Sequence, residues 1–162
     1  MAEKMIKVSR YRTGNYAVNY NQNGRTVTYK WAGSKHGRVD TQLVPEYIVN
    51  WLLMNANTFA NGSLVIEEDE NSKEIVDSID KDEEIKNNVH TREEVEKLLS
   101  GNFTKTKQDE LNKITNKAEK DFVINVAKEM KLDSVAKRKF LVEWAGINSE
   151  MVFEDEEGTN EK

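Results

Sequence analysis

Aromatic and basic side chains are interleaved over the first 38 residues, and they are the residues of this chain best suited to recognising a ligand. The aromatic set is Tyr11, Tyr16, Tyr20, Tyr29 and Trp31, and the cations among and after it are Arg10, Arg12, Arg25, Lys30, Lys35 and Arg38. Aromatic rings on a sheet can stack on bases while arginines bind phosphates, and the same cations suit an acidic protein surface. We therefore predict these six cations as candidate contacts for a protein partner or for nucleic acid.

A simpler interpretation is that the aromatic residues form the core of a small sheet. A module of roughly 60 residues buries only about 60% of its unfolded surface, so it needs large apolar side chains for stability. The chain also has no sequence signature of a known nucleic-acid-binding motif. Protein binding is thus the leading interpretation, and nucleic-acid binding by residues 1–60 is the alternative.

Residues that commonly carry catalysis or bind metals are scarce. The chain has no cysteine, and its two histidines, His36 and His90, lie far apart in the sequence. The glycine-bearing segment 33–37 lacks the residue order of a phosphate-binding loop, and the Asp80–Asp82 alternation lacks the glycine and glutamate of a calcium-binding loop. We therefore expect a protein that is not an enzyme and that has no metal site and no cofactor.

Charge divides the 162-residue chain into unlike parts. Residues 1–60 carry eight basic and three acidic side chains, whereas residues 61–90 carry three and ten. Residues 91–150 are nearly balanced, with twelve and eleven, and residues 151–162 carry one and five. The acidic segments would keep the protein in solution or compete for its basic part. A nucleic-acid-binding module at residues 1–60 would then be autoinhibited by them.

The first part predicts a small antiparallel sheet with one packed helix. Strand-like runs at about 4–11, 16–20 and 25–31 predict a three-stranded meander, and the Asn23–Gly24 pair is typical of a tight hairpin turn. Pro45 favours the start of a helix over 44–55, in which Trp51 is expected on the buried stripe. A strand over 63–67 would return to the same sheet.

The second part predicts four helices. Candidate N-caps are Thr91, Thr106, Asn116 and Asp133, and Gly146 is a candidate stop. In the last helix Trp144 is expected to be the largest buried side chain. The domain organisation predicted is therefore a β-rich module at 1–66, a flexible acidic linker at 67–90, a helical bundle at 91–150 and an acidic tail at 151–162, which together make an α+β protein.

Three stretches of the first 66 residues carry a resemblance to known proteins: the loop at 31–37 (WAGSKHG), the helix at 44–55 (VPEYIVNWLLMN), and the turn and strand within 59–66 (FANGSLVI). In these the chain resembles the small virion-associated proteins of large tailed bacteriophages. That resemblance implies a structural or assembly role in a capsid, neck or tail, with other virion proteins, and the protein itself, as partners. It assigns no functional residue.

The start of the chain lacks the pattern of a secretory signal, and no apolar run approaches the ~20 residues that a membrane span needs. We therefore expect the protein in the host cytoplasm during infection or in the virion, without a membrane partner. A phage-encoded acidic inhibitor of a host protein would share the same composition and remains a further alternative.

Overall fold

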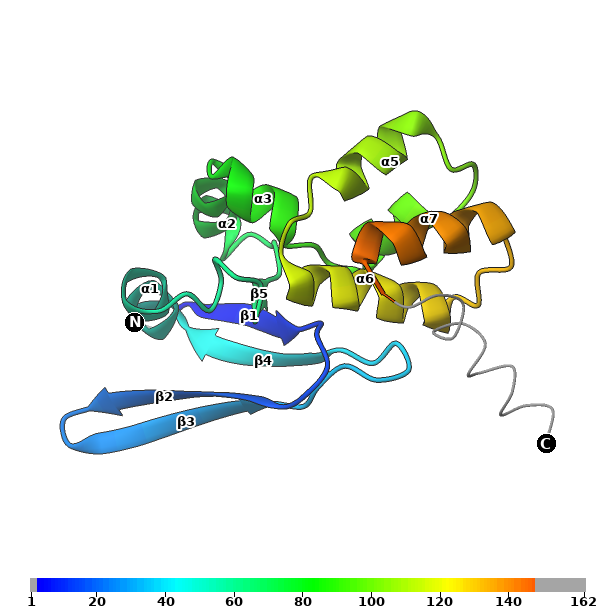
Figure 1. Ribbon diagram of the computed structural model, residues 1–162. Coiled ribbons are helices and arrows are strands. Elements are labelled where there is room, and N and C mark those ends of the chain that lie inside the picture. Colours follow the sequence, from blue (N-terminus) through cyan, green and yellow to red (C-terminus); the bar gives the residue numbers. More distant parts are fainter. Residues whose placement is uncertain (1–2, 148–162) are drawn as a thin grey trace, which may run out of the picture. The chain divides into compact units, whose positions relative to one another are not determined.

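The protein consists of two compact units in the computed structural model, which describes residues 3–147 (Figure 1). The first unit extends to Thr91 and the second begins at Arg92. The first combines an antiparallel sheet with helices, and the second is helical throughout its described part. The predicted α+β class is therefore confirmed. The acidic tail predicted at 151–162 and the end of the predicted bundle lie outside the described residues.

The sheet of the first unit has the order β4-β1-β5, with β1 (Met5–Arg10) in the middle. β4 (Asp40–Pro45) pairs antiparallel with β1 along its whole length, and β5 (Val65–Ile66) pairs with it on the other side. The predicted three-stranded meander is therefore wrong, because the strand that follows β1 in sequence does not pair with it. Its partner β4 lies 30 to 40 residues further along the chain and leads directly into α1 (Glu46–Asn55) at Pro45.

β2 (Tyr16–Gln22) and β3 (Arg25–Trp31) form a separate hairpin, visible as its own ribbon in Figure 1. Its turn residues Asn23 and Gly24 both have positive φ, 53° and 78°, as a two-residue hairpin turn requires. The register places Tyr16 opposite Trp31. The predicted hairpin is thus confirmed.

Trp31 packs this hairpin against the sheet. Its side chain is only 1% exposed, and its indole Nε1 donates a hydrogen bond of 2.8 Å to the carbonyl of Val8 on the central strand. The remaining core residues come from β1, β2, β4, α1, the 58–64 loop and β5: Ile6, Val8, Val18, Val44, Ile48, Val49, Leu52, Phe59, Leu64 and Ile66. The simpler interpretation of the aromatic residues therefore holds for Trp31.

Residues 67–90 are folded, which corrects the predicted flexible linker. They form α2 (Lys73–Asp80) and α3 (Glu83–Asn88), and Ile75, Val76 and Ile79 of α2 pack against the sheet core. The turn before α2 is held by the buried Ser72, whose Oγ donates to the carbonyl of Glu67 at 2.6 Å. Three apolar residues are too few to form a core alone, but they are enough to dock a helix onto an existing one.

The second unit contains α4 (Arg92–Leu99), α5 (Lys105–Asn112), α6 (Lys117–Glu129) and α7 (Val135–Ala145). The side chains of Thr104, Asn116 and Ser134 cap α5, α6 and α7 by accepting backbone N–H groups. Asn116 was predicted, whereas Thr106 and Asp133 were not the capping residues. α6 is the central core helix, with buried Phe122, Val123, Ile124, Val126 and Ala127.

Side chains of α7 donate hydrogen bonds to backbone carbonyls at the C-terminal ends of α4 and α5. Lys137 Nζ donates to the carbonyl of Leu99 at 2.9 Å, and Trp144 Nε1 donates to that of Leu111 at 2.8 Å. Trp144 is only partly buried, and the fully buried residue of α7 is Leu141. The prediction that Trp144 is the largest buried side chain of this helix is therefore wrong, and its indole instead binds the end of α5 to α7. Gly146, with φ 66°, ends α7 as predicted.

Arg92 links the first turn of α4 to the end of α6. Its guanidinium forms ion pairs with Glu129 of α6 and, at 3.1 Å, with Glu96 of its own helix. Burial alone would lower the pKa of Arg92, but the hydrogen bonds and charges of Glu129 and Glu96 outweigh it and raise that pKa. The guanidinium of Arg92 therefore keeps its positive charge in these ion pairs.

Candidate protein-interaction site

Arg10 is a structural residue rather than a surface contact. It is 9% exposed, and its guanidinium donates to the carbonyls of Gly14 at 3.0 Å, Thr13 at 2.7 Å and Ser63 at 2.7 Å. It also lies over the ring of Tyr16, 5.2 Å from the centroid. Burial, and then the positive charge of Arg12, lower the pKa of Arg10. Its donors are directed at backbone, so the predicted role in partner binding is corrected.

Arg12 is likewise a buried structural residue rather than a surface contact. It is 8% exposed, and its Nη1 donates to the carbonyl of Asn61. Gly62 lies directly against this guanidinium, since a Cβ atom at Gly62 would come within 2.4 Å of Arg12 Nη2. Two of the six predicted cations therefore hold the loops around β1 together.

The other four predicted cations are exposed. Two of them share one loop, and no contact found among the described residues brings the four into a single site. Arg25 follows the hairpin turn, and Lys30 lies on the face of β3 opposite to that of Trp31. Lys35 and Arg38 form an isolated backbone β-bridge in the loop before β4. Their role as partner or nucleic-acid contacts stays a prediction.

An aromatic patch lies where the hairpin meets α1, and it consists of Tyr20, Val27, Tyr47 and Trp51. The ring of Tyr20 meets those of Tyr47 and Trp51 edge to face, with centroid distances of 5.8 and 5.3 Å. Trp51 is nevertheless 38% exposed and Tyr47 40% exposed. The prediction that Trp51 belongs to the buried stripe of α1 is therefore wrong.

The reason is that α1 has more apolar side chains than the sheet can cover. Only Ile48, Val49 and Leu52 are buried among its residues, while Leu53 and the 85% exposed Met54 face outward. A helix that is apolar on most of its circumference is normally buried on both sides. This excess of apolar residues between 47 and 54 was the sequence signal that part of the helix stays exposed.

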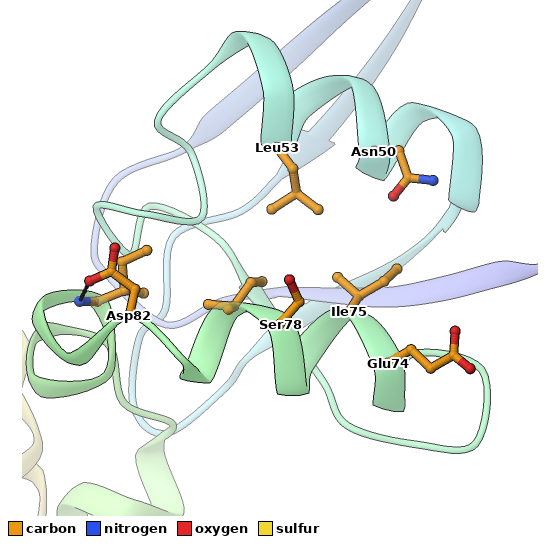
Figure 2. Close-up of a pocket in the computed structure, with 8 residues that line it drawn as sticks. Asn50, Leu53, Glu74, Ile75, Ser78 and Asp82 are labelled. Atoms are coloured by element: carbon orange, nitrogen blue, oxygen red, sulfur yellow. Dashed lines mark hydrogen bonds between the residues drawn. The ribbon is translucent and has the colours of Figure 1, made fainter.

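A groove of about 420 Å³ lies on the other side of α1, between that helix and α2–α3 (Figure 2). Its residues are Asn50, Leu53, Glu74, Ile75, Ser78, Ile79, Asp82 and Ile85. In Figure 2, Leu53 of α1 faces Ile75 and Ser78 of α2 across the groove. The Asp82 carboxylate accepts the backbone N–H groups of Glu84 and Ile85 at 3.0 and 3.3 Å, so it is fixed as the N-cap of α3. The groove thus has an apolar floor and an acidic rim.

Over residues 3–147, no three His, Asp or Glu side chains come together in an arrangement that could hold a metal ion. Within the same range, each helix is too short or too polar to span a bilayer.

Comparison with protein families gives the same division of the chain. Residues 4–81 match the model of the YonA N-terminal domain, and residues 91–151 match that of the YonA C-terminal domain. Both YonA domains are matched, in order. The N-terminal YonA match includes α2, in agreement with the packing of that helix on the sheet core. YonA is a phage-associated name, so the comparison supports a phage-related protein.

No curated protein and no solved structure gives a significant match to the chain.

Proposed function

We propose that this phage-related protein is a non-enzymatic adaptor or assembly component of a tailed-phage particle, acting in the virion or in the host cytoplasm during infection. Its ligands in this proposal are other virion proteins. The observation that carries the proposal is the exposed apolar face of α1, on which Tyr47, Trp51 and Met54 reach solvent together.

Such a face is costly to leave uncovered, because an exposed apolar patch promotes nonspecific association unless a partner covers it. Aromatic residues and methionine are also the residue types enriched where proteins bind each other. The YonA matches add the phage connection. The nucleic-acid alternative receives less support, since Arg10 and Arg12 are committed to backbone carbonyls.

Site-specific photo-crosslinking tests the proposal. A photoreactive phenylalanine analogue would replace Trp51 in the full chain, expressed in cells that produce the phage encoding it. Thr28 is the matched control position, because it is exposed on the hairpin and lies outside the aromatic patch. We expect position 51, and not position 28, to crosslink to a virion protein identified by mass spectrometry, and the crosslinked product to persist in purified particles.

Equal crosslinking at the two positions would refute the proposed adaptor surface. A gel-shift measurement at ~50 mM salt addresses the nucleic-acid alternative, because phosphate contacts are strongest at low salt. Retardation of DNA or RNA that is lost when Arg25, Lys30, Lys35 and Arg38 are replaced by glutamine would favour that alternative instead.

A further inference from the structure

We propose that the groove between α1 and α2–α3 binds an amphipathic helix of a partner protein, with an apolar stripe flanked by lysine or arginine. This inference rests on the proposed protein-binding function and specifies the chemistry of one partner. It concerns a surface that is distinct from the aromatic patch, because Tyr20, Val27, Tyr47 and Trp51 do not line the groove.

The floor of the groove supplies anchoring sites for apolar side chains. Ile75 and Ile79 are one helical turn apart on α2 and only partly buried, and the partly buried Ile85 of α3 lines the same groove. Leu53 of α1, 37% exposed, forms the facing wall. A volume of about 420 Å³ lies within the ~300–1,000 Å³ range of pockets that enclose whole small ligands. The groove therefore has room for more than one side chain.

The walls of the groove favour a helix as its occupant. Both walls are helices, so their surfaces consist of ridges spaced three and four residues apart, which complement the ridges of a third helix. A helix in such a groove places side chains at i, i+3 or i+4, and i+7 into the floor. The partner's apolar stripe would therefore pack along Ile75, Ile79 and Ile85.

The charge around the groove selects a basic partner. Glu74 and Asp82 line the groove, and the segment 67–90 that forms this side of the unit has ten acidic and three basic residues. Such a surface attracts cations and increases their rate of association. The chain's own residues 151–162 carry five acidic side chains and one lysine, so they have the wrong charge to occupy the groove.

Fluorescence anisotropy with the full chain tests this proposal. The probe is a labelled synthetic peptide with leucines at i, i+3, i+4 and i+7 and lysines or arginines on both flanks. The control is a peptide of the same composition whose order removes the helical apolar stripe. We expect the first peptide to bind at least about tenfold tighter than the second, which corresponds to ~1.4 kcal/mol, and its affinity to fall as salt screens the rim.

Three single variants locate the binding to the groove. Ser78→Trp fills the groove from its exposed α2 wall and should abolish saturable binding of the amphipathic peptide. Glu74→Lys and Asp77→Lys change the charge of α2 equally, but only Glu74 lines the groove. Glu74→Lys should weaken binding by roughly three- to tenfold, and Asp77→Lys by less than about threefold, because a charge acts mainly on its close neighbours.

Equal binding of the two peptides, or equal weakening by the two lysine variants, would overturn the proposal and leave only nonspecific attraction. Self-association of the chain that Ser78→Trp prevents would also overturn it, by making a second copy the occupant. Circular dichroism of each variant shows whether it is folded. If Ser78→Trp is unfolded, the comparison of Glu74→Lys with Asp77→Lys still tests the groove, because both residues are exposed. If the wild type fails to bind the amphipathic peptide but still crosslinks at position 51, the groove alone is refuted, whereas absence of crosslinking at position 51 refutes the adaptor surface.

Discussion

At the scale of single residues, buried guanidinium groups hold together the loops around β1. Arg10 reaches the carbonyls of Thr13 and Gly14 on one loop and of Ser63 on another, a span that its rigid, planar fork of donors can cover. Arg12 reaches Asn61 in the second loop. Two neighbouring positive charges are tolerated here because backbone carbonyls accept their hydrogen bonds.

Arg10→Lys should therefore lower the free energy of unfolding by about 2–3 kcal/mol, since a single ammonium group cannot make all of these hydrogen bonds to a buried charge. Arg25→Lys is the matched control, because Arg25 is exposed, and it should change stability by less than about 0.5 kcal/mol. Urea denaturation of the three proteins measures both values. Equal stability of Arg10→Lys and the wild type would show that the three hydrogen bonds contribute little.

Gly62→Ala should destabilise the first unit more than Gly24→Ala. Both glycines have φ +78°, so both substitutions carry the cost of about 1–3 kcal/mol for a side chain in that region. At Gly62 the new Cβ also meets the guanidinium of Arg12, whereas at Gly24 it meets open space. Thermal melts would measure the difference, and equal losses would mean that Arg12 moves aside without cost.

At the scale of secondary-structure elements, α2 depends on the sheet that it covers. An isolated helix shorter than about 12–15 residues is marginal in water, and α2 has eight residues. Its stability comes from Ile75, Val76 and Ile79 on the sheet core and from the Ser72 turn that precedes it. Because the groove uses α2 as one wall, the proposed binding site exists only while this helix is docked.

Val76→Asp should detach α2, because it places a carboxylate against the apolar core. In the wild type, trypsin should cleave slowly after Lys73 and Lys81, and in the variant these sites should be cut quickly. Asp77→Asn, which changes an exposed residue of the same helix, is the control. Rapid cleavage of the wild type at both lysines would restore the flexible-linker interpretation of residues 67–90.

At the scale of the whole molecule, each unit has a core of its own. Leu64 is fully buried in the first unit and Leu111 in the second. The two family matches divide the chain at nearly the same place, with the second beginning at residue 91. The units are therefore candidates for separate unfolding.

Leu64→Ala and Leu111→Ala should each cost about 2–5 kcal/mol, through lost burial and the cavity left behind. Hydrogen exchange followed by mass spectrometry should show faster exchange mainly in residues 3–91 for the first variant and in residues 92–147 for the second. Each variant serves as the control for the other. Faster exchange in both units from either substitution would mean that the two cores unfold as one.

The sequence by itself determined the features that depend on a few neighbouring residues. The positive φ angles of Asn23 and Gly24, the start of α1 after Pro45, the Asn116 cap and the Gly146 stop all follow from local backbone chemistry. The α+β class followed from the same signals, because they marked most helices and strands correctly.

Only the tertiary structure decided which surfaces those elements share. The pairing of β1 with β4, the burial of Arg10 and Arg12, and the docking of α2 each join residues that are distant in sequence. The groove was also beyond sequence reasoning, although the Ile75–Ile79 spacing was a signal for an amphipathic helix. The physical reason is that burial is a property of the assembled core: by composition, an acidic segment with only five apolar residues is a solvated linker. It folds into helices when a sheet core is present for one of them to cover.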